Sequence, residues 1–286
     1  LPYKYNDVPS PCVDNHMICA LFLNGNTYLL DATGATNDWN KYPYYLEGKE
    51  ALIAQGNNYK IFNVPISESN ENVCALNYTL DVSKPEKPMI NGNVKLTGTL
   101  FKIYKSIYTD AKMENKKEFP NNVISNLFKS SILPINAIVT FSEKELTISF
   151  KADGQPLVSK NGNSLQITQA AFEYFPLTFL HKSKNTPLFL EFPYTYKINS
   201  TITGNVKLSN PVTYSKSNGI STITKKTTGN GNEIKDELMV QITKPIILEK
   251  NFADWNDIIT DYYNQYGIIN ASIFYRSYFE AFMIPY

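Results

Sequence analysis

The chain has 286 residues, 43% of them hydrophobic and 19% charged, and its 27 basic and 26 acidic side chains leave a net charge of +1. These values are typical of a globular protein and exclude wholesale disorder. A balance so close to neutral offers no electrostatic footprint for nucleic acid or for an anionic membrane surface, so we expect no nucleic-acid partner. No apolar run reaches the ~20 residues that a bilayer-spanning helix needs, so we expect no membrane span.

Cysteine and histidine are scarce, which limits the kinds of site that the chain can build. The three cysteines, Cys12, Cys19 and Cys74, are an odd number without CxxC spacing. The two histidines, His16 and His181, lie far apart in the sequence. This usage signals neither a disulfide framework nor a zinc site, and we expect no metal and no cofactor.

The first strongly patterned segment predicts a β-hairpin. Two apolar runs, residues 17–23 and 26–31, flank the dipeptide Asn24-Gly25. Asn-Gly between apolar runs is the strongest short-range hairpin signal, because both residues tolerate the positive φ of a two-residue turn.

A polar run at residues 67–72 is the best candidate for a linker. We therefore expect a first domain of residues 1–68 and a second domain of residues 69–286.

Beyond this run, apolar and polar residues alternate with the period of two that is typical of β-strands. Strands are predicted at residues 74–82, 92–100, 137–141, 146–150, 188–192, 194–197, 220–225 and 237–242. Turn signals such as Asn91-Gly92 separate them. Amphipathic helices are predicted at residues 121–129 and 253–266. The expected class is mainly β, with an antiparallel β-sandwich, a few short helices and a C-terminal helix in the second domain.

The predicted hairpin brings one histidine close to one aspartate. With a two-residue turn at Asn24-Gly25, counting back along both strands places Ile18 opposite Asp31. His16 and Asp31 then share a face as diagonal neighbours, roughly 7–8 Å apart at the backbone and within side-chain reach. The carboxylate can accept a hydrogen bond from one imidazole nitrogen and leave the other to serve a nucleophile. The same contact can also be a purely structural pair.

No cysteine of the chain is placed to be that nucleophile. Cys19 is an odd number of residues from His16, so it points to the opposite face of the strand, and we expect it to be a small core hydrophobe. Cys12 has the right parity but lies about 13 Å away along an extended strand. Cys74 lies beyond the expected domain boundary.

Residues 14–33, which read DNHMICALFLNGNTYLLDAT, carry a resemblance to a known family. They resemble the His–Asp segment of secreted bacterial transglutaminase-like proteins. In that family an Asn-His-hydrophobic strand, a short Asp/Asn-Gly turn and a Leu-Asp-Ala-Thr strand recur. Residues 42–60 resemble the continuation of that segment, so the resemblance covers about residues 10–65. It implies proteins with a DUF3857 domain, a papain-like transglutaminase core and a C-terminal β domain.

By this resemblance, His16 and Asp31 match the catalytic His and Asp of the family. The family's nucleophilic Cys lies at a helix N-terminus some tens of residues before the His, where the helix dipole favours thiolate. Only 15 residues precede His16. The expectation is a chain that starts inside a transglutaminase-like domain, lacks the nucleophile and is inactive alone.

The resemblance further implies the function of the intact protein. The expected chemistry is that of a thiol protease, amidase or acyl transferase on peptide amides. Its partners would be a peptide or protein substrate and the missing N-terminal part of the same polypeptide. The expected location is periplasmic, cell-surface or secreted.

Two alternatives stay open from the sequence. The chain can instead be a non-catalytic binding or structural β module of the cell envelope, with a degenerate transglutaminase-like domain. The aromatic run at residues 172–176 can pack in the core or bind a sugar or peptide. The mixed-charge residues 112–117 favour a solvated surface over an anion site, and His181 is given no role.

Overall fold

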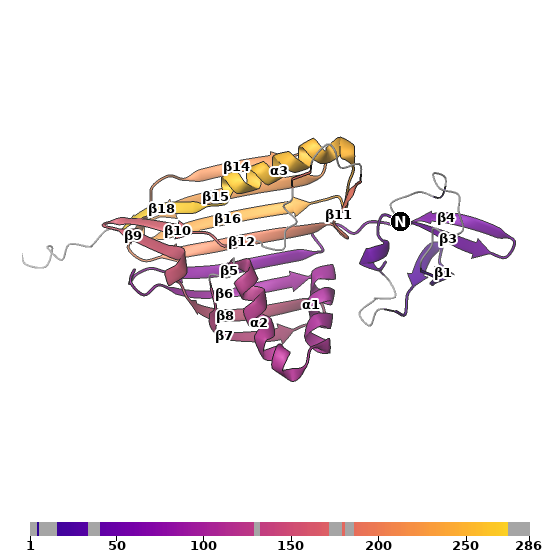
Figure 1. The fold of residues 1–286 in the computed structure, drawn as a ribbon, viewed down its shortest axis with the longest axis horizontal. Helices are drawn as coiled ribbons and strands as arrows, with labels where there is room; N and C mark the ends of the chain where they lie inside the picture. The colour runs from indigo at the N-terminus through magenta and orange to yellow at the C-terminus, as the bar shows by residue number, and fades with distance from the viewer. Residues whose placement is uncertain are drawn as a thin grey trace, which may run out of the picture.

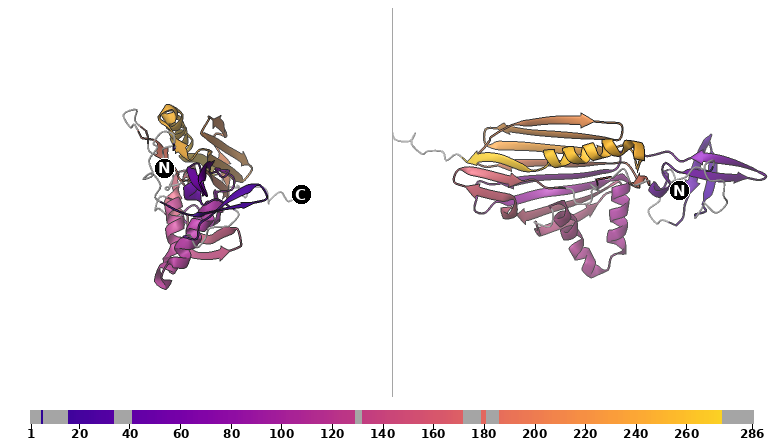
Figure 2. Two further views of the ribbon diagram at one scale, coloured as in Figure 1. Left: turned by 90° about the vertical axis from the view of Figure 1, so that its right-hand side faces the viewer. Right: turned by 45° about the horizontal axis from the view of Figure 1, so that its top comes forward.

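Two groups of elements lie along the longest axis of the molecule (Figure 1). The structure is a computed structural model that describes Tyr5 and residues 16–33, 41–128, 132–171, 179–180 and 186–273. We call the elements from β1 to β4 the small unit and those from β5 to β18 the large unit. The small unit lies beyond one end of the large sheet in Figure 1 and in the right-hand view of Figure 2.

The small unit is made of two β-hairpins and one turn of 3-10 helix. Strands β1 (Cys19–Leu23) and β2 (Asn26–Leu30) form the first hairpin, and β3 (Glu50–Gln55) and β4 (Asn58–Asn63) form the second. Between the hairpins lies η1 (Tyr44–Leu46). The core between these elements has three buried hydrophobic residues, Leu29, Ile53 and Val64.

The large unit is built on an eight-stranded mixed sheet of described residues. In spatial order its strands are β14 (Val212–Ser217), β15 (Ser221–Asn230), β16 (Glu233–Ile242), β12 (Tyr194–Thr203), β5 (Val73–Asp81), β6 (Met89–Thr97), β8 (Glu145–Asp153) and β7 (Pro134–Phe141). Along β5 every second side chain is buried, which is the pattern expected of a sheet with one covered face. The predicted mainly β class is confirmed.

One central strand pair differs from the antiparallel expectation. Strands β5 and β12 run parallel, with Asn77 beside Asn199. The chain reaches this arrangement because long connections separate the two strands in sequence, as parallel pairing requires. Asn199 donates its side-chain amide to Asn77 at 2.8 Å, and Asn77 donates to Asn93 of β6 at 3.1 Å. This row of amides joins the parallel pair to its antiparallel neighbour on the solvent face.

The other face of the large sheet is covered by helices and a second sheet, which lie in front of it in Figure 1. The covering elements are α1 (Gly98–Asp110), α2 (Met113–Leu127), α3 (Phe252–Gln265) and a four-stranded sheet of β13 (Val206–Leu208), β18 (Ile268–Ile273), β10 (Ser164–Thr168) and β9 (Val158–Asn161). The short elements are η2 (Gln155–Leu157), η3 (Glu249–Asn251) and the pair β11 (Leu188–Phe189) and β17 (Ile246–Ile247). One large core fills the space between the two layers.

Asn91-Gly92 was expected to be a turn, and this expectation is wrong. Both residues lie inside β6, where a Cβ on Gly92 would come within 2.8 Å of the Phe150 ring and of the Asn77 carbonyl oxygen. Glycine is therefore needed here for close packing rather than for a turn, as a glycine inside a strand often signals.

The predicted helices and strands match unevenly. The helix expected at 253–266 is confirmed as α3, whereas α1 was not predicted and α2 begins earlier than expected. Only two residues of the strand expected at 188–192 form one.

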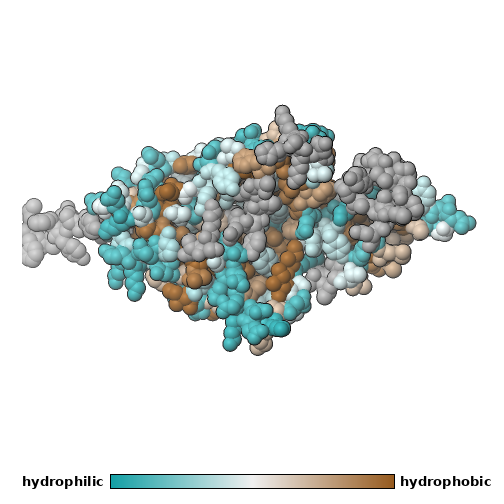
Figure 3. Space-filling view, viewed as in Figure 1, coloured by the Kyte–Doolittle hydropathy of each residue, from teal (hydrophilic) through white to brown (hydrophobic). Residues whose placement is uncertain are grey.

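Hydrophilic surface covers the tip of the α1–α2 pair, where residues 112–118 are mostly exposed (Figure 3), in keeping with a solvated surface. Among the described residues, no helix is both long and apolar enough to cross a membrane.

Candidate active site

The first hairpin has the register that its sequence predicts. Leu23 pairs with Asn26, and Ala20 pairs with Leu29. The two turn residues take positive φ, 52° at Asn24 and 79° at Gly25, as a type I′ turn requires. This register fixes which side chains share a face, and it carries Asp31 to the end of β2 on the face toward His16.

His16 and Asp31 contact each other directly. Nε2 of His16 lies 2.7 Å from Oδ2 of Asp31. The aspartate side chain is fully buried, whereas the imidazole is 34% exposed. The structure therefore brings together both residues that the sequence singled out, with the carboxylate inside and the imidazole at the surface.

Asp31 is held by two further residues. Thr33 donates its backbone N–H, at 2.9 Å, and its hydroxyl, at 2.6 Å, to Oδ1. Tyr45 donates its hydroxyl to Oδ2. Burial alone would raise the pKa of Asp31, but the hydrogen bonds from Thr33, Tyr45 and His16 outweigh it and hold the pKa well below its usual range. Asp31 is therefore an anion at neutral pH.

The charge of Asp31 decides how the imidazole is oriented. An ionised carboxylate can only accept hydrogen bonds, so Nε2 of His16 must donate. In the neutral ring Nδ1 then carries the lone pair. A general base needs a basic lone pair on one ring nitrogen, and here Nδ1 carries it. A buried anion hydrogen-bonded to the other nitrogen stabilises the protonated ring.

Thr33 and Tyr45 are site residues that the sequence analysis did not single out as functional. Thr33 could have been found, because it lies two residues after Asp31, the spacing at which an aspartate caps its own turn. Tyr45 comes from η1, and no local pattern links it to Asp31. Its place at the site depends on how the hairpins and η1 pack together.

Cys19 cannot serve His16 from its place in β1. It pairs with Leu30 on the face of the hairpin that points away from the site, as strand parity predicts. The expectation that it lies in the core is wrong, because Cys19 is exposed. The hairpin has only one covered face in the described part of the chain, and that face carries His16.

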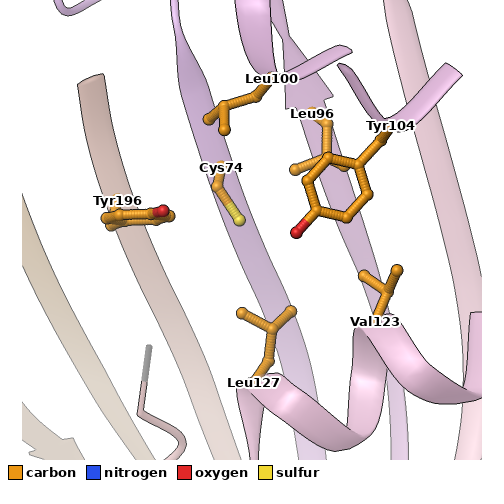
Figure 4. A pocket seen from close by; sticks show the side chains of 7 residues that line it. All are labelled: Cys74, Leu96, Leu100, Tyr104, Val123, Leu127 and Tyr196. Atoms are coloured by element: carbon orange, nitrogen blue, oxygen red, sulfur yellow. The ribbon is translucent and has the colours of Figure 1, made fainter. Parts of the chain in front are cut away.

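Cys74 is excluded by its surroundings. It lines a cavity of about 20 Å³ together with residues of α1, α2, β6 and β12, among them Leu100, Val123 and Tyr196 (Figure 4). A space of this size holds about one water molecule. Burial raises the pKa of the Cys74 thiol to about 12, so it is protonated at neutral pH. Cys74 is therefore a buried core residue and not a nucleophile.

A second charged cluster lies buried in the large unit. Oδ1 of Asp236 forms an ion pair with Nζ of Lys225 and accepts from the hydroxyl of Thr227, each at 2.6 Å, while Oδ2 accepts from Gln169. Gln169 also accepts from the backbone N–H of Gly267 at 3.0 Å. Desolvation lowers the pKa of Lys225, and the adjacent Asp236 opposes that shift. Because the carboxylate is fully paired, the cluster joins the two layers of the large unit and does not form a reactive site.

Metal-ligating side chains do not cluster in the described part of the chain. No three His, Cys, Asp or Glu residues gather within the described ranges in a way that could hold a metal ion. Three residues or segments considered from the sequence, Cys12, His181 and residues 172–176, lie outside the described residues.

Comparisons with known proteins add little to this geometry. No protein-family model matches the sequence, and no curated protein matches it. Among solved structures, the chain is similar to a candidate protease from Parabacteroides distasonis, at 15% identity with a TM-score of 0.35. The similar region covers 40% of this chain and 24% of that one. A TM-score of this size does not establish a shared fold.

Proposed function

We propose that His16 is the general base of a transglutaminase-like thiol enzyme that acts on peptide amides, and that the Asp31 carboxylate is its orienting partner. The observation that carries the proposal is the 2.7 Å contact between Nε2 of His16 and a fully buried Asp31 carboxylate. His16 would take the thiol proton through Nδ1 as the sulfur attacks the amide carbonyl. It would then give that proton to the departing amine, leaving an acyl thioester for water or another amine to resolve.

Neither described cysteine can reach His16, and Cys12 lies about 13 Å from His16 if the strand between them is extended. We place the nucleophile upstream of this chain in the natural polypeptide, as the resemblance to the transglutaminase-like family implies. The outer face of β1 offers a surface on which a further segment could pack. Met17, Leu21 and Leu23 on that face are 95%, 38% and 45% exposed. Burying these side chains would stabilise a complete domain through the hydrophobic effect.

Thiol reactivity tests the proposal without knowledge of the substrate. The natural full-length polypeptide would be pulsed with iodoacetamide at pH 6, and each cysteine followed by mass spectrometry. A thiol beside an imidazolium stays thiolate at this pH, so one upstream cysteine should react at least about tenfold faster than in His16→Gln. His181→Gln is the matched control and should leave that rate unchanged. If no cysteine depends on His16, the proposal is wrong.

A second candidate is a non-catalytic binding or structural β module of the cell envelope. The specific observation in its favour is that Cys19 faces away from the site and Cys74 is a buried thiol. In that case the His16–Asp31 pair holds the end of the first hairpin. This candidate would be favoured over the enzyme if the upstream region has no cysteine and if His16→Gln leaves all alkylation rates unchanged.

A further inference from the structure

The turn η1 connects three parts of the molecule through three successive side chains. Tyr44 packs against the core of the large unit, where its ring lies edge-on to Phe192 with centroids 5.6 Å apart. Tyr45 donates its hydroxyl to Asp31. Leu46 packs against the core of the small unit. A single helical turn therefore links the His16–Asp31 pair to both units.

The hydrogen bond from Tyr45 differs in kind from those of Thr33. Thr33 follows Asp31 by two residues and donates to Oδ1, so its position is set locally by the end of β2. Tyr45 binds Oδ2, the same oxygen that accepts from His16. Its ring also stands edge-on to the imidazole, at 78° and 6.2 Å between centroids. Tyr45 thus fixes the oxygen that orients the imidazole.

Contacts on both sides of η1 hold it against the segment that leads into the large sheet. Before η1, Lys41 forms an ion pair with Glu71 at 2.7 Å. After η1, the buried Glu47 carboxylate accepts from the backbone N–H and the hydroxyl of Ser67, at 2.9 and 2.8 Å. The position of Tyr45 is therefore set by the segment that leads into β5 and by the contact of Tyr44 with Phe192, as well as by the hairpin that carries the site.

From this geometry we propose that Tyr45 is a positioning residue for the His16–Asp31 pair, and that the packing of Tyr44 on Phe192 sets its place. The inference rests on the proposed function and deepens it, because it names what controls that site. The large unit then acts on the site through η1. When Tyr44 of η1 packs on Phe192, Asp31 holds the imidazole with Nδ1 free. When η1 moves away from Phe192, that orientation of the imidazole is lost.

The tautomer of His16 reports directly whether Tyr45 positions the His16–Asp31 pair. We would record ¹⁵N NMR spectra of the 286-residue chain with His181→Gln, which leaves His16 as the only histidine. At a pH where the ring is neutral, we expect a single tautomer with the proton on Nε2. In Tyr45→Phe the Asp31 carboxylate loses its fixed position, and the ratio of tautomers should move about fivefold toward Nδ1–H, the factor expected if the hydrogen bond between His16 and Asp31 is lost as a result. Tyr59→Phe removes a hydroxyl from a 71% exposed residue of β4 and should change nothing.

A second variant tests the link through the large unit. Phe192→Ala should move the tautomer ratio in the same direction by a smaller factor, whereas Phe189→Ala, at a 41% exposed position, should not. Near-UV circular dichroism would check that each variant folds. If Phe192→Ala does not fold, Tyr44→Ala tests the same contact from a less buried side.

The outcomes separate this inference from the proposed function. An unchanged tautomer ratio in folded Tyr45→Phe overturns the inference, even if thiol reactivity depends on His16. A shifted ratio in a protein without a His16-dependent cysteine supports positioning by Tyr45 and rejects the thiol enzyme.

Discussion

The two units of this chain differ sharply in how they are held together. The large unit has an eight-stranded sheet, a covering layer and nearly all of the buried hydrophobic residues. The small unit has two two-stranded hairpins and three buried hydrophobic residues. Isolated hairpins are marginally stable in water, so the small unit depends on contacts beyond its own core. The candidate site lies in this weaker unit, with its geometry supported by a turn packed on the stronger one.

The largest expected effect on stability lies in the core of the large unit. Replacing Asp236 by alanine leaves Lys225 buried without its partner, which typically costs about 3–5 kcal/mol. Urea unfolding followed by near-UV circular dichroism would measure this loss. Glu233→Ala on the same strand is the matched control, because its ion pair with Lys235 is largely exposed and worth at most about 1 kcal/mol. Equal losses of unfolding free energy in the two variants would show that the buried Asp236 stabilises the large unit no more than an exposed carboxylate does.

A smaller and more local effect is expected in the small unit. Leu29→Ala removes one of its three buried hydrophobic residues, for which we expect a loss of about 2–3 kcal/mol. The loss should appear as faster amide exchange in β1 to β4, with the large unit still protected. Leu23→Ala, on the same hairpin but 45% exposed, should change exchange little. If the whole chain unfolded together in Leu29→Ala, the two units would be one cooperative body.

The smallest effect is expected from Glu47, a carboxyl whose pKa is raised in the fold. Burial raises the pKa of Glu47 above its ordinary value of 4.5, so the folded state binds its proton more tightly. Stability from this group is therefore greatest at low pH and falls as pH rises through the folded pKa. Glu47→Gln keeps an acceptor for Ser67, and we expect a gain on the order of 0.5 kcal/mol at neutral pH with less pH dependence.

Asp31 should show the reverse dependence. Its pKa is lowered in the fold, so its contribution is present above the ordinary aspartate pKa and is lost as pH falls through the folded value. Amide exchange in residues 41–63 against pH would separate the two groups, with Asp31→Asn as the partner variant to Glu47→Gln. The same sign for both groups would contradict this account of their burial and hydrogen bonding.

The sequence predicted the contact between His16 and Asp31 better than it predicted the surroundings of that pair. The Asn24-Gly25 turn fixes the register of the first hairpin locally, so counting residues was enough to bring His16 and Asp31 together. Tyr45 could not be found in this way, because its contact depends on the packing of η1. Cys19 was placed on the correct face but expected to be buried, since strand parity says nothing about whether a face is covered.

In the large unit, too, some features could be predicted from the sequence and others could not. Alternation located most strands, and the helical pattern located α3. The parallel pairing of β5 and β12 depends on contacts between distant segments and leaves no local signal. Gly92 was read as part of a turn because Asn-Gly favours turns, whereas close packing against Phe150 decides its structure.

Turnover by the natural full-length polypeptide tests the central claim most directly. Peptide amides would be supplied with and without an added primary amine, and hydrolysis or transfer followed by mass spectrometry. The account predicts that His16→Gln and Asp31→Asn each lose at least about a hundredfold in rate while keeping their fold, and that His181→Gln keeps the wild-type rate. Turnover at the wild-type rate in both site variants would contradict the assignment of His16 and Asp31 to catalysis.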